Sequence, residues 1–270
     1  MRIISFHKAV ASGNDFVIIK NRTFSKSELR DTAIKLCSRK YGVGADGLLV
    51  AESSKRADLK MRIFNSDGTE AEMCGNGMRS FILWAYNKKL IAINSFIETK
   101  AGIIIGKVKK DDFIKIKIGA SFEYRPNLKV KVDGKTIEGD YLDTGVPHFV
   151  VEVSTLCGYD VFNIGSKIRH HSIFKPRGTN VDFMHWERGY LAVRTYERGV
   201  ETETLACGTG CVASALIAGL KRGYDSKNIV VLPLSGERLR VSYSYQKGRF
   251  SDVYLEGEAE LLFESKFKIK

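Results

Sequence analysis

Long apolar runs are missing from this sequence of 270 residues. No stretch approaches the roughly 20 consecutive apolar residues that a transmembrane helix needs, so we expect no membrane span and no membrane partner. The first ten residues, MRIISFHKAV, have neither a long apolar centre nor a small-residue cleavage site, and we therefore expect no signal peptide. Low-complexity segments are missing as well, which favours a globular chain with a packed core.

Cysteine is scarce, with five residues at positions Cys37, Cys74, Cys157, Cys207 and Cys211. This odd number does not show the pattern of a small secreted disulfide scaffold, so we expect reduced thiols and a cytoplasmic location. Zinc sites usually draw on paired ligands such as Cys-x2-Cys, and here the only close pair is 207 and 211. The sequence therefore predicts no bound metal.

Positive charge is in excess, with a net charge of +12. The Lys and Arg residues are scattered over segments such as KVKKDDFIKIKIG, and alternating Lys on strand-like segments is typical of a solvated or edge face. A nucleic-acid-binding module remains an alternative that rests on this charge alone. Because an aromatic RNA-binding block is lacking, we expect no nucleic-acid partner.

Short segments rich in Val, Ile, Tyr and Phe, separated by Gly, Asp and Asn, predict many strands. Few segments show a helical pattern: residues 27–40, with Ser27 as the expected N-cap, 75–87, 208–222 and, more weakly, 158–170. The helices expected at 75–87 and 208–222 are apolar on most sides and should be buried. We predict an α+β fold of two similar halves, each a curled, mostly antiparallel sheet around a central helix.

A cysteine followed by Gly-x-Gly and an apolar helix occurs twice, in AEMCGNGMRS at 71–80 and in ACGTGCVAS at 206–214. The first N–H groups of a helix lack partners within it, and the helix dipole adds partial positive charge there. Such a site binds a carboxylate and favours the thiolate of a neighbouring Cys, so we expect the pKa of each thiol to be lowered. A buried apolar Cys is the alternative, and we expect it for Cys37, Cys157 and Cys211.

Nucleotide binding is a weaker interpretation of the glycine-rich stretches. GVGADG at 42–47 matches Gly-x-Gly-x-x-Gly, but it follows a helical pattern and precedes a strand, the reverse of the required order. GTGCVA at 208–213 lacks a clear βαβ frame. We therefore expect no dinucleotide.

Two segments around the cysteines, FNSDGTEAEMCGNGMRS and ERGVETETLACGTG, resemble the active-site blocks of the diaminopimelate epimerase family. SGNDFVII, GVGADGLL, TGVPHFV and GTNVDF are similar to its remaining blocks, in the same order. Members related to proline racemase usually carry His after Cys-Gly in the first block. Because this chain has Asn76 there, the resemblance favours the diaminopimelate branch.

This resemblance implies two pseudo-symmetric domains, residues 1–119 with roughly 258–270 and residues 120–257. It also implies inversion of LL-2,6-diaminopimelate to the meso form, a step toward lysine and peptidoglycan precursors, without pyridoxal phosphate, metal or other cofactor. A homodimer acting on a small amino acid is expected. One cysteine, as thiolate, would remove the α-proton while the other, as thiol, delivers a proton to the opposite face.

The resemblance also assigns site residues. Cys74 and Cys207 would be the catalytic pair, and His148 and Glu197 would tune the pKa of the thiols. The residues expected to bind substrate are Asn14, Asn65, Gly75, Asn76, Asn180, Glu197, Arg198, Gly208 and Thr209. From the residues alone, Asn14 and Asn65 would also suit turns, and the pair Glu197 and Arg198 would suit an exposed surface.

Three departures concern the far end of the substrate. Gly47 stands where many members have Gln, Val146 stands where many have Asn, and VET after Glu-Arg-Gly is longer and more acidic than usual. A racemase of the same fold with another amino-acid substrate is therefore the alternative function.

Overall fold

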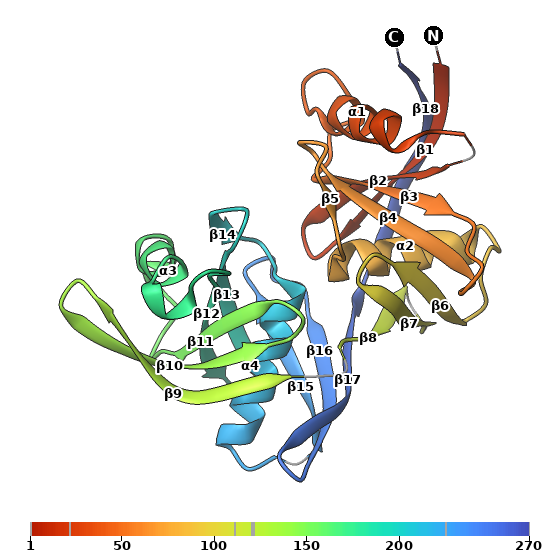
Figure 1. The fold of residues 1–270 in the computed structure, drawn as a ribbon. Coiled ribbons are helices and arrows are strands. Elements are labelled where there is room, and N and C mark those ends of the chain that lie inside the picture. Colours follow the sequence, from red (N-terminus) through yellow and green to blue (C-terminus); the bar gives the residue numbers. More distant parts are fainter. Residues whose placement is uncertain (1, 22, 111, 120–121, 225, 270) are drawn as a thin grey trace. The chain divides into compact units, whose positions relative to one another are not determined.

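The chain divides into two compact units. Unit 1 is Met1–Ile116 together with Gly257–Lys270, and unit 2 is Lys117–Glu256. In Figure 1, unit 1 runs from red to yellow and includes the last, blue strand. The computed structural model describes residues 2–21, 23–110, 112–119, 122–224 and 226–269. The domain border expected between 119 and 120 falls beside residues 120 and 121, which lie outside the described residues.

Unit 1 is a mixed sheet with two helices. The helices are α1 (Lys26–Cys37) and α2 (Gly75–Asn87). The strands are β1 (Arg2–Ala11), β2 (Asn14–Lys20), β3 (Gly47–Glu52), β4 (Leu59–Asn65), β5 (Glu70–Ala71), β6 (Asn94–Thr99), β7 (Gly102–Val108), β8 (Phe113–Lys117) and β18 (Glu260–Ile269). They pair in the order β18-β1-β2-β3-β4-β6-β7-β8, with β5 on the end of β4. The pairs β2–β3 and β4–β6 are parallel, and the others are antiparallel.

Unit 2 repeats this plan. Its helices are α3 (Val161–Arg169), the short 3-10 helix η1 (Ser172–Phe174) and α4 (Gly208–Lys221). The strands are β9 (Glu123–Val132), β10 (Lys135–Asp143), β11 (Pro147–Glu152), β12 (Asn180–Glu187), β13 (Tyr190–Glu197), β14 (Thr202–Thr204), β15 (Ser226–Pro233), β16 (Leu239–Gln246) and β17 (Arg249–Glu258). They pair in the order β9-β10-β11-β12-β13-β15-β16-β17, with β14 on β13.

The two orders correspond strand by strand. In unit 1, α1 links the parallel pair β2–β3, and α2 links the parallel pair β4–β6. In unit 2, α3 links β11–β12 and α4 links β13–β15 in the same way. The short strands β5 and β14 each end three residues before a cysteine that is the N-cap of a helix. The predicted α+β fold of two similar halves is confirmed, and four parallel pairs interrupt the mostly antiparallel pairing.

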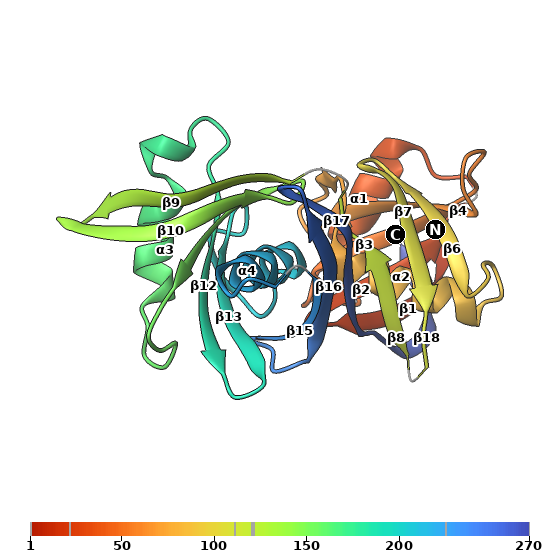
Figure 2. The same ribbon diagram turned by 90° about the horizontal axis from the view of Figure 1, so that it is seen from below.

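Both central helices are buried, as their apolar sequences predicted. Figure 2 shows α4 end-on, with β12, β13, β15 and β16 around it. Residues 210–219 of α4 are all buried, and so are residues 75–85 of α2, which packs on β1, β2, β4, β7 and β18. A helix with apolar groups on every side needs such enclosure, because no face of it can turn to water at low cost. No helix within the described ranges is long and apolar enough to cross a membrane.

Two local expectations were wrong. The N-cap of α1 is Ser25, not Ser27: its hydroxyl accepts from the Glu28 N–H, and the Glu28 carboxylate accepts from the Ser25 N–H. This reciprocal pair satisfies two donors at the helix start, which Ser27 cannot do from inside the first turn. Cys157 is exposed rather than part of the core, because it lies in the loop between β11 and α3.

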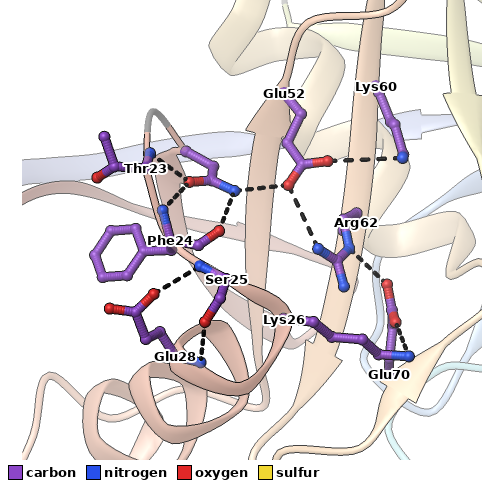
Figure 3. A network of polar contacts seen from close by, with 10 residues as sticks. Thr23, Phe24, Ser25, Lys26, Glu28, Glu52, Lys60, Arg62 and Glu70 are labelled. Atoms are coloured by element: carbon purple, nitrogen blue, oxygen red, sulfur yellow. Dashed lines mark hydrogen bonds and ion pairs between the residues drawn. The ribbon is translucent and has the colours of Figure 1, made fainter.

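A polar network ties the start of α1 to the strand before Cys74 (Figure 3). Arg62 on β4 donates from Nε to Glu70 on β5 over 2.7 Å and from Nη1 to Glu52 on β3 over 3.4 Å. Lys26 on α1 lies 3.4 Å from the same Glu70 carboxylate. The hydrogen bond from Arg62 lowers the pKa of Glu70, so the pair stays ionised at neutral pH. β5 has two residues, and this network anchors it.

Replacing Ser25 by Ala should destabilise unit 1, because the helix loses its capping hydroxyl. We expect the free energy of unfolding to fall by about 1 kcal/mol. Ser27→Ala is the matched control, and as an exposed change it should alter stability by less than about 0.5 kcal/mol. Urea unfolding followed by circular dichroism measures both, and equal effects of the two variants would contradict the cap at Ser25.

Candidate active site

Cys74 is the N-cap of α2, in unit 1. Its extended backbone (φ −142°, ψ 123°) places Sγ 3.5 Å from the Gly77 N–H, from which it accepts. The side chain is half-buried, and Gly75 and Asn76 follow it as the first residues of the helix. We call Cys74, these two residues and Asn14 the first half-site.

A buried guanidinium fixes the amide groups of the first half-site. Arg79 donates from Nη2 to Asn76 Oδ1 and to Ser12 Oγ, each over 2.7 Å, and from Nη1 to the Glu258 carbonyl over 2.7 Å. Because a guanidinium only donates, the oxygen of Asn76 must face it. Asn76 Nδ2 then donates to Asn14 Oδ1 over 2.8 Å. The structure therefore brings Asn14 and Asn76 together in one orientation.

The turn between β1 and β2 holds Asn14 in place. Asn14 Nδ2 donates to Asp46 over 3.0 Å, and Arg39 bridges Asp46 and Asp15 with contacts of 2.8 Å to each. Lys8 donates to Asp15 over 2.6 Å. Although burial acts in the opposite direction, the hydrogen bonds from Arg39 and Lys8 lower the pKa of Asp15 to about 2. This ionised cluster fixes the loop from which Asn14 projects.

Asn65 ends β4 and forms a turn, as its neighbours Asp and Gly suggested. Its backbone exchanges contacts with Thr69 and Gly68, and its side chain donates to Thr69 Oγ1 over 2.9 Å. The side chain is exposed, and its place in substrate binding stays a prediction.

Cys207 is the N-cap of α4, in unit 2, and it heads what we call the second half-site. Its residue is only 6% exposed, and Sγ lies 3.4 Å from Thr209 Oγ1. Gly208 and Thr209 are the first two residues of the helix, as Gly75 and Asn76 are in α2.

Three buried polar side chains, from three adjacent strands, lie beneath the first turn of α4. The carboxylate of Asp182 on β12 accepts from His148 Nδ1 over 2.7 Å and from Thr195 Oγ1 over 2.7 Å. The side chains of His148 and Asp182 are fully buried. Because a carboxylate only accepts, Nδ1 of His148 carries the proton. Among the described residues, the buried Nε2 of His148 has no hydrogen-bond partner.

Glu197 and Arg198 are not the exposed pair that their sequence alone would suit. Burial raises the pKa of Glu197, whose carboxylate accepts from Thr204 Oγ1 over 3.0 Å. The Arg198 N–H donates to Asn180 Oδ1 over 2.8 Å, and Asn180 Nδ2 donates to the Pro147 carbonyl over 3.1 Å. Asn180 and Arg198 are thereby held together beside the strand that carries His148.

The thiol of Cys207 is not activated in the way that its helix terminus predicted. Burial, then the charges of Glu197 and Asp182, raise the pKa of Cys207 well above its usual range, and the hydrogen bond with Thr209 only partly offsets them. The expected lowering is wrong here, because removal from water and two nearby carboxylates disfavour the thiolate more than a helix N-terminus favours it. At neutral pH this residue is a thiol.

The two Gly-x-Gly stretches need their last glycine for different reasons. A Cβ on Gly210 would lie 2.2 Å from Asp182 Oδ1 and 3.1 Å from Thr195 Oγ1. A Cβ on Gly77 would meet Leu49 Cδ2 at 3.2 Å, with Ile63 and Phe16 at 3.5 Å. At Gly210 the Cβ would meet a carboxylate that hydrogen bonds hold in place. At Gly77 it would meet methyl groups of Leu49 and Ile63, which can shift, and a carbon of the Phe16 ring. The helix start therefore packs on polar side chains in unit 2 and on apolar side chains in unit 1.

Sequence reasoning missed Arg79, Asp182 and Thr195. Each has a local signal: Arg79 is a charged residue inside the apolar run MRSFILW, and Asp182 interrupts the buried segment around Val181 and Phe183. Charged residues are rarely fully buried unless paired, so both positions indicated a partner. The identity of that partner depends on the fold. In the part of the chain that the structure describes, no group of three or more His, Cys, Asp or Glu side chains could hold a metal ion.

Comparison with known proteins identifies the family. The family model for diaminopimelate epimerase matches residues 6–122 and 141–262. The diaminopimelate epimerase of Aquifex aeolicus is 39% identical over 97% of each chain, and that of Archaeoglobus fulgidus is 41% identical over 93% of this chain and 95% of its own. This chain belongs to the diaminopimelate epimerase family. It is accordingly an isomerase of the epimerase type.

Solved structures show the same fold at much lower identity. A phenazine biosynthesis protein of the PhzF family from Bacillus anthracis matches with a TM-score of 0.82 at 19% identity, over 100% of both chains. A hydroxyproline epimerase from Agrobacterium vitis matches with a TM-score of 0.73 at 14% identity, over 98% of this chain and 92% of its own. Both comparisons support the α+β architecture of the epimerase family.

Replacing each glycine by Ala should distinguish the two helix starts by the free energy of unfolding that each variant loses. Gly210→Ala should lower the free energy of unfolding by roughly 2 kcal/mol, because the methyl group collides with the Asp182 carboxylate. Gly77→Ala should cost less than about 1 kcal/mol, since Leu49 can shift and Ala favours the helix. Thermal and urea unfolding measure both variants. A larger loss for Gly77→Ala would contradict the difference in packing.

Proposed function

We propose that this enzyme inverts one α-carbon of LL-2,6-diaminopimelate to give the meso form without a cofactor, as a step toward lysine and peptidoglycan precursors. Cys74 and Cys207 are the proposed acid/base pair, acting on opposite faces of that carbon. The supporting observation is that each of them is the N-cap of a buried helix, in one of two units with the same topology. The proposed substrate is the one in the name of the two relatives, diaminopimelate epimerase.

The difficult step is removal of a weakly acidic α-proton. Negative charge then develops toward the substrate carboxylate, and N–H groups at a helix start stabilise it where it forms. The proposed donors are the first two residues of each helix, Gly75 with Asn76 and Gly208 with Thr209. Arg79 also fixes the side chain of Asn76 at this helix start before substrate arrives, which supports a preorganised site.

The raised pKa of Cys207 supports one assignment of the acid and the base. Because burial and the Glu197 charge raise the pKa of Cys207, it enters the reaction as a thiol and is the proposed acid. Cys74 is then the proposed base for the LL isomer, and the roles are exchanged in the reverse reaction. His148 and Glu197 are the groups proposed to adjust the pKa of the thiols. The remaining contacts, Asn14, Asn65, Asn180 and Arg198, are proposed to hold the substrate's amino and carboxylate groups.

A different substrate is the second candidate, and one structural observation favours it. Gly47 begins β3, and a Cβ there would lie 3.0 Å from the Phe64 carbonyl and 3.5 Å from the Phe16 ring. The contact that Gln at this position would supply is therefore absent, and Val146 cannot replace it with a hydrogen bond.

A panel of L-amino acids assayed beside LL-diaminopimelate distinguishes the two candidates. We expect kcat/KM for LL-diaminopimelate to exceed that for any monocarboxylic amino acid by at least about 100-fold, because a site built for a second charged end loses binding when that end is missing. A higher value for proline or another simple amino acid would assign the enzyme to that substrate instead.

The finer expectations about the cell and the assembly also stay proposals. We expect a cytoplasmic enzyme, because its proposed chemistry needs free thiols, and all five cysteines are free. A homodimer is supported by the exposed apolar side chains of Leu262 and Phe263 on β18. No nucleic-acid partner is expected.

Single replacement of either cysteine tests the proposed mechanism. Cys74→Ser and Cys207→Ser should each lower kcat by at least about 100-fold, because a hydroxyl is a far weaker acid than a thiol and is not ionised near neutral pH, so it can neither deliver nor remove the proton efficiently. Cys157→Ser, at an exposed loop position, is the matched control and should keep full activity. Wild-type enzyme in deuterium oxide should place deuterium at the α-carbon. Near-normal turnover by either active-site variant would end the proposal of a cysteine pair.

A further inference from the structure

We propose that Asp182 is the positioning residue of the second half-site. Its carboxylate holds the His148 ring in one tautomer, and it brings a negative charge beneath the first turn of α4, the helix that Cys207 caps. The inference rests on the proposed function, since it concerns the acid of the proposed pair. Asp182 is assigned no contact with substrate, and it acts through the two residues above it.

The equivalent place in unit 1 shows what the fold itself requires. In the register of the parallel strands, Phe16 pairs with Gly47 on β3 as His148 pairs with Asn180 on β12. Two residues further along each of these strands come Leu49 and Asp182.

The next strand completes the comparison. Leu49 pairs with Ile63 on β4, and Asp182 pairs with Thr195 on β13. The apolar trio Phe16, Leu49 and Ile63 thus lies under Gly77, where the polar trio His148, Asp182 and Thr195 occupies the equivalent positions under Gly210.

This substitution of a polar trio for an apolar one is not needed to close the sheet on its helix. Unit 1 achieves the same close approach with carbon atoms alone. A fully buried carboxylate is costly unless its hydrogen bonds repay the loss of water, and an apolar replacement of similar volume is often neutral or stabilising. The retention of Asp182 therefore points to the chemistry of the half-site that carries Cys207.

The geometry defines what Asp182 does to His148. Both oxygens of the carboxylate are engaged, Oδ2 with His148 Nδ1 and Oδ1 with Thr195 Oγ1. The tautomer that Asp182 selects has its proton on Nδ1 and Nε2 as the acceptor. Nε2 is buried and without a hydrogen-bond partner in the described structure, so it is available to a donor that enters the site. The substrate ammonium group has that chemistry.

The electrostatic effect on Cys207 comes from few groups. Among the described residues, the titratable side chains that face α4 from neighbouring strands are His148 on β11, Asp182 on β12, Glu197 on β13, Asp140 on β10 and Tyr243 on β16.

Two of these groups lie at the far end of the helix. Asp140 is paired with Lys221 over 2.6 Å, and Tyr243 lies against Gly219. The helix has 14 residues, and at about 1.5 Å per residue that end lies roughly 20 Å away. On α4 itself, Cys211 is buried one turn beyond Cys207. Among the described residues, Glu197 and Asp182 are therefore the carboxylates whose charges, after burial, raise the pKa of the Cys207 thiol.

The test is Asp182→Asn, which keeps shape and hydrogen bonds but removes the charge. Alkylation of each cysteine by iodoacetamide, followed by mass spectrometry across a pH series, reports how readily each thiol ionises without requiring turnover. We expect the Cys207 profile to move to lower pH by about one unit, which is about tenfold faster alkylation on the rising limb. The profile of exposed Cys157 in the same samples should not move. The alkaline limb of kcat/KM should follow the Cys207 profile.

One control and one substitute variant distinguish this role from a structural one. Thr195→Val removes a hydrogen bond but keeps the Asp182 charge, so it should leave the Cys207 profile within about 0.3 unit. If Asp182→Asn does not fold, the variant H148F/D182L/T195I copies the trio of unit 1 and takes its place, with the same expected shift.

An unchanged Cys207 profile in the variant without the charge would overturn the inference, whatever its activity. Failure of both variants to fold would do so as well, because the polar trio would then be a requirement of the fold. The proposed cysteine pair is tested separately, by the activity of the two serine variants.

Discussion

The close approach of a helix start to the sheet around it is the constraint on which the rest of this structure depends. At Gly77 and Gly210 the backbone of the helix comes so near the strands that a single methyl group would meet them. Each helix that makes this approach has a cysteine as its N-cap, and the dipole of the helix places partial positive charge beside that cysteine. The apolar helix sequences follow from the same constraint, because a helix enclosed by strands has no side left for water.

One topology, used twice, produces two chemically different surroundings. In unit 1 a buried guanidinium orients amide groups beside Cys74, and carbon atoms fill the space below the helix. In unit 2 carboxylates and an imidazole fill that space, and the Cys207 thiol keeps its proton. The proposed reaction needs one thiolate and one thiol at the same time, and the buried Cys207 fits the role of the thiol.

Local patterns were sufficient for the features that depend on neighbours in sequence. Both helices that follow the cysteines begin where the Gly-x-Gly stretches predict, since an N-cap and its first turn are consecutive residues. The N-cap of α1 lies two residues before the predicted one. From the sequence, Ser25 and Ser27 fit the N-cap position equally well, and only the contact with Glu28 distinguishes them. The trio around Asp182 could not be predicted, because its members come from three strands whose register only the fold defines. The raised pKa of Cys207 follows from burial and from the charges of Glu197 and Asp182, which also depend on the fold, and it was missed for the same reason.

The last strand has a consequence for how the protein is made. β18 comes from the end of the chain and pairs with β1 from its beginning, whereas unit 2 is one uninterrupted segment. On the ribosome, unit 2 can therefore complete its sheet while unit 1 still lacks a strand. The carbonyl of Glu258, which receives a hydrogen bond from Arg79, follows unit 2 in the chain. The surroundings of Cys74 can therefore form completely only after unit 2 has been synthesised.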